Sequence, residues 1–594
     1  MKPDKLADSS DAGSFTPLHR AVLGGRLQEA KRLLNCGADV DERLAGLGWT
    51  PLYLAAVLSE SPNLLALLLD HGADVEVRDY HGATALHGAV ESRRSPWVVA
   101  LLLDHGADVG AKDEEGHTPL RTAARWATDP EVVALLLDRG ADLTERDSEG
   151  FTPLHAAVRL GRQPQVVSLL LDRGADLHER SETGSTTLQM AAFVGAGPAV
   201  VKVLLERGAD VNASSRHGET ALHAVAGGCQ DPAVAALLLD HGADLEARTS
   251  GGGTPLHFAV RKDAKTEILQ VLLERGANPN ARGNDGGTPL HVAAQGSGNP
   301  AVVPLLLRHG ASVDVRAQFG WTPLHVAAAW NRDPDEVARL LDRGALLEAR
   351  TDDGRTPLHA AAICANQQAM AILLKHGADI RARASNGREP LHAAVEKEGT
   401  PEGVALLLDH GADIRARDHD DRTALHVAAQ ANSNPQVTAL LLDRGADITA
   451  RDVVGQQPLH VAAGTSGNPE VVEVLLKRAA DPNTRAVAGW TSLHVAAGWT
   501  SFPEVVRLLL EHGADLEAQT DAGQTPLHTA VMIGHHPQVV ETLLARGADR
   551  RMPDYIRWSL AESVHRNKSL RDSELDRRLQ DDESHIRVER PAGR

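Results

Sequence analysis

A leucine recurs at an almost constant interval through most of this chain. It first stands in Thr16-Pro17-Leu18-His19 and occurs sixteen times as far as Leu527, and fourteen of the fifteen intervals are 34 residues long. Each copy is followed by small apolar residues, a Leu-rich segment and Gly-Ala-Asp or a variant. A unit this short cannot bury its own apolar face, so the copies must stack on their neighbours. The 594 residues therefore predict a periodic solenoid rather than about four globular domains.

The thirteenth unit shows what each position contributes. Leu425 lies in a short apolar helix, and Asn434 and Pro435 then start a second helix. The Asn side chain can cap free backbone N–H groups, and a proline at the first helical position has no N–H that needs a partner. Apolar residues continue at helical spacing to Leu442, and Gly445 ends the helix because glycine adopts the left-handed C-cap conformation without strain.

The pattern T-P-L-H, A-A, L-L-L, G-A-D resembles the signature of the ankyrin repeat family over about residues 11–549. The resemblance implies an all-α repeat solenoid, a curved stack of antiparallel helix pairs with protruding β-hairpin loops. The period of 34 is longer than the usual repeat of about 33. We interpret the extra residue as a lengthened turn between the two helices, and the stretch Cys364–Gln368 as the shorter form of that turn.

Both ends depart from the pattern. Residues 1–10 form a polar N-terminal segment, and the second helix of the first repeat is polar, which suits a solvent-facing cap. Beyond residue 549 the signature weakens, but Ile556, Leu560 and Val564 share a helical stripe. Residues 550–570 are therefore predicted to form a capping helix or a degenerate half-repeat. Residues 571–594 are dense in charge and are predicted to be a frayed helix or a disordered tail.

Composition excludes several classes of function. The net charge is −19, whereas binding to nucleic acid or to an anionic membrane needs clustered positive charge. No apolar run approaches the roughly 18 residues that cross a bilayer, and the N-terminus carries no apolar signal segment. Cys36, Cys229 and Cys364 are far apart, which argues against disulfides and favours a reducing compartment. We expect a soluble, cytoplasmic and monomeric protein.

Histidine is abundant, but its arrangement does not indicate a reactive site. Thirteen of the 29 histidines stand fourth in the Thr-Pro-Leu-His motif, where the resemblance implies a structural hydrogen bond to backbone at the loop. Among the histidines outside the motif, only His535 and His536 form a close pair. No phosphate-binding loop, zinc-protease or nucleophile-elbow motif occurs. The sequence predicts no enzyme activity, no metal and no cofactor; an enzyme or metal protein is the alternative from another class.

The informative residues are those that vary between copies. We number positions within a repeat from the loop aspartate, so that the leucine of Thr-Pro-Leu-His is position 8. Of fifteen aromatic residues before residue 550, eleven stand at positions 2, 3, 5, 13 and 14, which the resemblance implies are the variable positions of the concave face. Aromatic side chains on a rigid surface are typical binding hot spots. The alternative is that each ring packs on its own loop.

Repeats 10 and 15 each carry Trp at positions 5 and 14, and these pairs are the sharpest candidates. Between them, position 5 is Arg in three successive repeats, an arrangement we call the Arg ladder. The ladder would suit an acidic partner segment, although neighbouring aspartates such as Asp353 and Asp418 could neutralise it. The full set of candidate protein-binding residues is Trp49, Trp126, Phe151, Phe319, Trp321, Trp330, Arg355, Arg388, Arg422, Trp490 and Trp499.

The function predicted from these features is a non-enzymatic protein–protein interaction scaffold. A protein or peptide partner would bind the concave face formed by the hairpin loops and first helices, as the resemblance implies. The alternative with the same mechanism is a secreted effector that acts on a host protein through this surface. Fold alone does not identify the partner.

Overall fold

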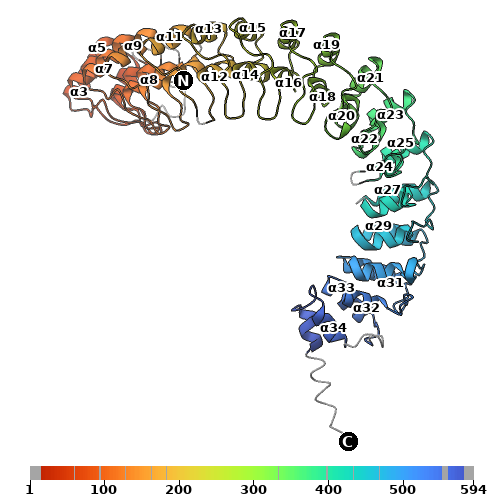
Figure 1. Cartoon of the computed structure of the whole chain (residues 1–594). Helices are drawn as coiled ribbons and strands as arrows, with labels where there is room; N and C mark the ends of the chain where they lie inside the picture. The colour runs from red at the N-terminus through yellow and green to blue at the C-terminus, as the bar shows by residue number, and fades with distance from the viewer. Residues whose placement is uncertain are drawn as a thin grey trace. The chain divides into compact units, whose positions relative to one another are not determined.

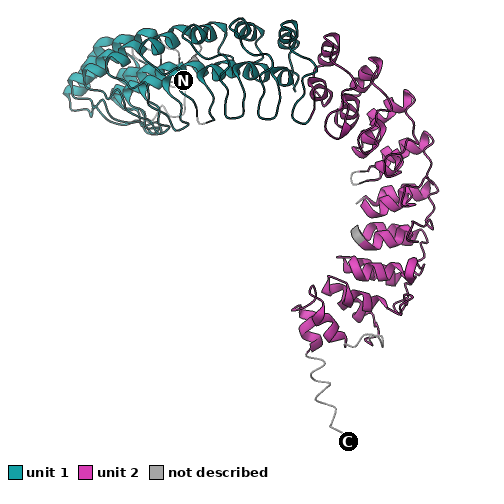
Figure 2. Ribbon diagram, in the orientation of Figure 1, with its two compact units in different colours: residues 1–285 teal, residues 286–594 magenta. Residues whose placement is uncertain are grey.

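The computed structural model describes residues 15–551 and 559–580, apart from residues 59–60, 93–94, 127–128, 162, 182, 262, 297, 332, 397–398, 432–433 and 467. Its helices come in pairs at the period of the leucine repeat. The chain divides into two compact units, unit 1 (residues 1–285) and unit 2 (residues 286–594) (Figure 2). Within the described residues, each unit contains eight helix pairs.

In unit 1 the helices form two layers. Figure 1 shows the second helices α13, α15 and α17 in one row and the first helices α12, α14 and α16 in a row beside it. The first helices are α2 (Pro17–Leu23), α4 (Pro51–Leu58), α6 (Ala85–Glu91), α8 (Pro119–Trp126), α10 (Pro153–Ala156) continued by the π-helix η1 (Ala157–Gly161), α12 (Thr187–Val194), α14 (Ala221–Gly227) and α16 (Pro255–Ala259). The second helices are α3 (Leu27–Asn35), α5 (Pro62–Asp70), α7 (Pro96–Asp104), α9 (Pro130–Asp138), α11 (Pro164–Asp172), α13 (Pro198–Glu206), α15 (Pro232–Asp240) and α17 (Thr266–Glu274).

Unit 2 repeats this arrangement and adds a short helix, α34 (Leu560–Arg566), after the eighth pair. Its first helices are α18 (Pro289–Ala294), α20 (Pro323–Trp330), α22 (Pro357–Ile363), α24 (Pro390–Ala394), α26 (Ala424–Ala431), α28 (Pro458–Val461) continued by the π-helix η3 (Ala462–Ser466), α30 (Ser492–Trp499) and α32 (Pro526–Met532). Its second helices are α19 (Val302–Arg308), α21 (Pro334–Asp342), α23 (Gln367–Lys375), α25 (Pro401–Asp409), α27 (Pro435–Asp443), α29 (Pro469–Lys477), α31 (Pro503–Glu511) and α33 (Pro537–Ala545).

The Thr-Pro-Leu-His motif starts the first helix and ties it to the next repeat. In repeat 10 the N–H and the hydroxyl of Thr322 both donate to Nδ1 of His325, at 3.3 and 2.8 Å. The other ring nitrogen, Nε2, donates to the backbone oxygen of Arg355 in repeat 11, at 3.1 Å. Burial lowers the pKa of His325 to about 4, so the ring is neutral near pH 7. The structural role predicted for the motif histidines is confirmed.

Second helices begin and end as the sequence predicts. Asn434 caps α27, its Oδ1 accepting from the N–H of Gln436 at 3.0 Å, and Pro435 is the first helical residue. After the helix, Gly445 has a φ of 89°, a conformation that other residues rarely adopt. Leu441 is fully buried, and α27 packs against α25 and α29 of the neighbouring repeats. The core is therefore completed between repeats, as expected for units that cannot fold alone.

The loops between repeats reverse direction without forming strands. Asp418 at position 1 accepts from the N–H groups of Asp420 and Arg422, both at 2.9 Å. The N–H of Val453 in the next loop donates to the carbonyl of Asp420 at 3.0 Å. These few bonds close each loop and join successive tips but do not build a ladder, and within the described residues the single strand-type bridge lies in the loop of repeat 6. The predicted β-hairpin loops are therefore stacked hairpin turns.

A short helix follows the last repeat. Ser559 and Glu562 form a capping box at the start of α34, which packs against α32. Leu560 and Val564 of the predicted stripe are buried. Ile556 and the N-terminal segment 1–10 lie outside the described residues.

The described structure continues beyond residue 570, into the stretch predicted to be a frayed helix or a disordered tail. Residues 574–580 are helical, and Leu575 and Leu579 are buried. Asp576, also buried, accepts a hydrogen bond from His565 of α34 at 2.9 Å. This segment adds an apolar pair and a hydrogen bond to the end of the stack.

Candidate functional site

The tryptophans at positions 5 and 14 are in contact. Trp321 and Trp330 stack with ring centroids 4.8 Å apart and planes 8° apart, and Trp490 and Trp499 lie 5.2 Å apart at 31°. The position-14 ring remains open to solvent in both pairs, 50% exposed for Trp330 and 47% for Trp499. Each pair therefore packs locally and also presents an aromatic surface, which combines the two alternatives drawn from the sequence.

The loops that carry these pairs are also alike. Residues 317–330 and 486–499, which we call the Trp modules, share the pattern A-x-x-G-W-T-x-L-H-V-A-A-x-W. Each loop contains a short 3-10 turn, η2 (Gln318–Gly320) or η4 (Val487–Gly489). Within these turns Phe319 and Ala488 have φ values of 59° and 60°, a left-handed conformation that is costly for residues other than glycine. The turn leaves the Phe319 ring 67% exposed.

The candidate aromatic residues of unit 1 pack within their own repeats. Trp49 stacks on Tyr53 at 5.0 Å, and Phe151 lies edge-on to His155 and beneath the Arg159 guanidinium, 5.0 Å from it. Trp126 lies 5.1 Å from the guanidinium of Arg125. These rings belong to repeats 2, 4 and 5 and are half-buried, so no two of them pair as the tryptophans of unit 2 do.

Each arginine of the Arg ladder has a partner inside the protein. Arg355 lies 3.1 Å from Asp353, and Arg422 lies 3.7 Å from the buried carboxylate of Asp452. Arg388 is held on both sides, by Glu396 of its own repeat at 2.7 Å and by the buried Asp418 of the next repeat at 3.2 Å. An acidic partner would therefore compete with internal carboxylates for these side chains.

Other arginines near the ladder brace the loops. Arg417 donates to the carbonyl of Asp421 in its own loop at 3.0 Å and to that of Arg451 in the next repeat at 2.7 Å. Arg383 makes the equivalent pair of bonds. All four arginines, Arg381, Arg383, Arg415 and Arg417, are exposed. Arg383 and Arg417 therefore keep their positive charge at the surface while their side chains are held by the loop carbonyls.

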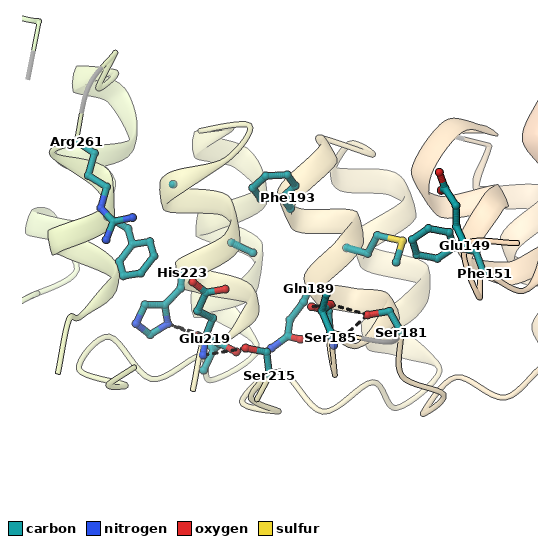
Figure 3. A pocket seen from close by; sticks show the side chains of 16 residues that line it. Glu149, Phe151, Ser181, Ser185, Gln189, Phe193, Ser215, Glu219, His223 and Arg261 are labelled. Atoms are coloured by element: carbon teal, nitrogen blue, oxygen red, sulfur yellow. Dashed lines mark hydrogen bonds between the residues drawn. The ribbon is translucent and has the colours of Figure 1, made fainter. Parts of the chain in front are cut away.

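A pocket in repeats 5 to 8 of unit 1 is a feature that the sequence did not reveal. It has a volume of about 390 Å³. Figure 3 shows Arg261 at one end, Glu149 and Phe151 at the other, and Phe193 across from Ser215. One wall is apolar, with Phe193, Phe258 and Met190 from first helices, and the loop wall carries hydroxyl groups. Glu219 is a half-buried carboxylate within it.

Small residues at variable positions open this pocket. Ser185, which lines the pocket, stands at position 5 of repeat 6, where Trp321 and Arg388 stand in their own repeats of unit 2. Gly227 stands at position 13 of repeat 7. Repeat 6 also has Gln189 in place of the motif histidine, and its Nε2 donates to the carbonyls of Ala213, at 2.9 Å, and Glu219. The sequence signal for the pocket was therefore the small residues at positions 5 and 13 of adjacent repeats, close to the aromatic residue Phe193.

Neither a metal cluster nor a membrane span is present in the part of the chain that the structure describes. No three His, Cys, Asp or Glu side chains gather as metal ligands there. His535 bonds Oγ of Ser569 at 3.0 Å. Among the described helices, none has both the length and the apolar character needed to cross a bilayer.

Comparison with known proteins identifies the family. A family model described as ankyrin repeats in three copies matches residues 18–113, 110–181, 188–283, 265–351, 328–418, 391–486 and 459–554. This chain is an ankyrin repeat protein. Such repeats are generally protein–protein interaction modules, and proteins of this family typically act as non-enzymatic scaffolds that bind protein partners.

Individual relatives cover only parts of this ankyrin repeat protein. The B-cell lymphoma 3 protein homolog of Mus musculus is 39% identical over 94 residues, 14% of this chain and 21% of that protein. Ankyrin repeat and SOCS box protein 6 of Homo sapiens is 42% identical over 78 residues, 13% of this chain and 18% of that protein. The crystal structure of the ankyrin repeat domain of Bcl-3 is 34% identical, covers 38% of this chain and 98% of that one, and has a TM-score of 0.33. The matches thus span about a fifth of these curated relatives.

Proposed function

We propose that this ankyrin repeat protein is a non-enzymatic scaffold that binds a protein or peptide partner. The binding surface is the face formed by loop positions 2, 3 and 5 and first-helix positions 13 and 14, which we call the hairpin–helix face. The observation that carries the proposal is the pair of Trp modules, because each packs two indoles against each other and leaves one about half exposed. Preorganised aromatic rings lose little side-chain entropy on binding and are typical anchors of an interface.

The Trp modules stand at the two ends of the Arg ladder along unit 2. Five repeats separate Trp321 from Trp490, at roughly 10 Å per repeat. A flexible segment of about 15 extended residues spans this distance. Acidic residues in the middle of that segment would meet the ladder, where Asp353, Glu396 and Asp418 already compete. We therefore assign most of the affinity to the tryptophans.

The remaining parts of the proposal concern location and assembly. Cys36, Cys229 and Cys364 are free thiols, and on that ground we place the protein in a reducing compartment such as the cytoplasm. We propose that it acts as a monomer, with the hairpin–helix face open to its partner.

The test is to capture partners with the full chain and identify them by cross-linking mass spectrometry. Cross-links should concentrate on the loops and first helices of repeats 10 to 15, and Trp330→Ala should reduce capture while Trp97→Ala, on the second helix α7, should not. Cross-links confined to second helices, or capture unchanged by Trp330→Ala and Trp499→Ala together, would reject this surface.

A further inference from the structure

The side chains at positions 5 and 13 of one repeat face each other, and in several repeats they form a matched pair. In repeat 12, Arg388 at position 5 meets Glu396 at position 13, at 2.7 Å. In repeat 13, Arg422 meets Gln430 at 3.1 Å. In repeat 5, the Arg159 guanidinium at position 13 lies over the Phe151 ring at position 5. A cation is thus repeatedly held between these two positions.

Repeat 7 has the anion of such a pair without the cation. Glu219 stands at position 5, but position 13 is Gly227, which has no side chain. The ion pairs among the described residues around repeat 7, such as Arg207–Asp172 and Arg275–Asp240, do not include Glu219. The space beside Gly227 is the pocket of about 390 Å³ described above.

The walls of this pocket suit a cation on an aliphatic stem. The Phe193 ring at position 13 of repeat 6 is 60% exposed, and the Phe258 ring forms the wall on the side of repeat 8. Phe258 already carries one guanidinium, that of Arg261, 4.0 Å from its ring centroid. Aromatic faces attract Arg and Lys, and their apolar surface covers the methylene stem.

We propose that the pocket of repeats 5 to 8 binds a basic side chain, Arg or Lys, from an extended segment of a partner protein. The cation pairs with Glu219 and its stem packs between Phe193 and Phe258. The partner thus supplies in repeat 7 the group that Arg159 supplies in repeat 5. The loop hydroxyls of Ser185 and Ser215 line the opposite wall, where they can bond the partner backbone. This inference rests on the protein-binding function proposed above and names the chemistry of one contact.

The test uses the full chain and labelled nonapeptide pools whose central residue is fixed as Arg, Lys, norleucine or Glu and whose other positions are randomised. Fluorescence anisotropy should show the Arg or Lys pool binding about tenfold more tightly than the norleucine pool. That preference should shrink at high salt because the charges are partly exposed.

Two variants then address the pocket directly. Gly227→Arg places an arginine opposite Glu219. This variant should reduce the ratio of the norleucine-pool Kd to the Arg-pool Kd to about one, and Glu219→Gln should do the same. The matched control is Gly227→Ala, whose added Cβ lies 3.1 Å from Cδ1 of Phe258, a ring that can shift. This control should keep the preference. Arg261→Ala should keep or raise it, because it removes a competing cation.

The inference is overturned if the wild-type protein binds the Arg, Lys and norleucine pools equally, or prefers Glu. It is also overturned if Gly227→Arg and Glu219→Gln both leave the preference intact. These readouts do not involve the Trp modules or a cellular partner. A loss of capture by Trp330→Ala together with an indifferent pocket would therefore reject only this inference, whereas a selective pocket without any captured protein would reject the scaffold function.

Discussion

Repeats 5 to 8 of unit 1 and the Trp modules of unit 2 use the variable positions of the repeat in opposite ways. In the Trp modules, positions 5 and 14 carry large rings that close on each other and present an anchor. In repeats 6 and 7, the small residues Ser185 and Gly227 line a pocket instead. The two regions share the same backbone frame. The size of the side chains at two or three positions therefore decides whether a repeat presents an exposed anchoring ring or forms a pocket that can receive a partner's side chain.

Acid is expected to have the largest effect, and to weaken unit 2 more than unit 1. All eight first helices of unit 2 carry the motif histidine, whereas unit 1 has Tyr53, Arg121 and Gln189 at three of its eight positions. Burial lowers the pKa of His359 and His460 to about 4. An unfolded histidine titrates near 6.5, so the unfolded chain takes up protons first as the pH falls. Stability is complete above about pH 6.5 and is lost toward pH 4, by at most ~1.4 kcal/mol per pH unit for each histidine.

Hydrogen exchange at pH 7 and pH 5, corrected for the intrinsic rate, checks this difference. Protection should fall further in the first helices of unit 2 than in repeats 2, 4 and 6. An identical loss in both units, or a melting temperature that does not change between the two pH values, contradicts the assignment of neutral buried histidines.

The next effect concerns the contact between repeat 4 and repeat 5, whose residues Glu149 and Phe151 line one end of the pocket. In repeat 4 an arginine replaces the motif histidine, and Nε of Arg121 donates to the fully buried carboxylate of Asp147 at 2.6 Å. Arg121→Ala leaves that carboxylate without its cation, although two backbone N–H groups still bond it. We expect a loss of about 2–3 kcal/mol, at or below the range for a broken buried ion pair.

Denaturant unfolding measures this loss, with Arg121→His as the control that restores the usual residue. The histidine variant should retain most of the stability because it can bond the next loop, as His325 does. If both variants unfold like the wild type, the ion pair contributes nothing and the pocket repeats do not depend on it.

Binding to an identified partner should depend most on the exposed indoles of the Trp modules. Trp330→Ala removes a half-exposed ring from a stacked pair, and we expect at least a tenfold loss of affinity, about 1.4 kcal/mol. Isothermal titration against the captured partner gives the value. Trp97→Ala serves as the control, and an equal effect of the two substitutions means that unit 2 offers no anchor.

The smallest effect is expected at the Arg ladder. Arg388→Glu should weaken the affinity for the same partner by about two- to fivefold. The effect is small because the Arg388 side chain is already paired with carboxylates inside the protein. The effect should fade at high salt, unlike that of Trp330→Ala. Arg444→Glu, at the end of α27 and paired with Asp409, is the matched control. If Arg388→Glu binds the partner as tightly as Arg444→Glu does, the Arg ladder is not part of the binding surface.

Much of this molecule follows from local chemistry that the sequence displays. The spacing from Leu18 to Leu527 predicted the helix pairs, and Asn434 with Pro435 and Gly445 predicted where a second helix begins and ends. The role of His325 was also readable, because its bonds to Thr322 and to the next loop recur in other copies of the motif, for example at His223 and His494. Repetition converts these local rules into reliable predictions.

The surface could be predicted only in part. The repeat positions identified Trp321 and Trp330 as candidates, but not that their rings stack and leave one face open. The sequence offered both readings of Arg388, a free charge and a neutralised one, and only the structure shows Glu396 and Asp418 bound to it. Such outcomes depend on rotamers and on side chains from the next repeat, which spacing along the chain does not specify.

The sequence by itself determined the family, the repeat, its caps and the positions that are free to vary, because each of these depends on contacts within about one period. The tertiary structure alone decided which free positions meet. It placed Glu219 opposite Gly227 with Phe193 and Phe258 beside them, and so made a pocket from residues that are unremarkable in the sequence. A pocket consists of missing volume between neighbouring repeats, and missing volume becomes visible only when the repeats are stacked.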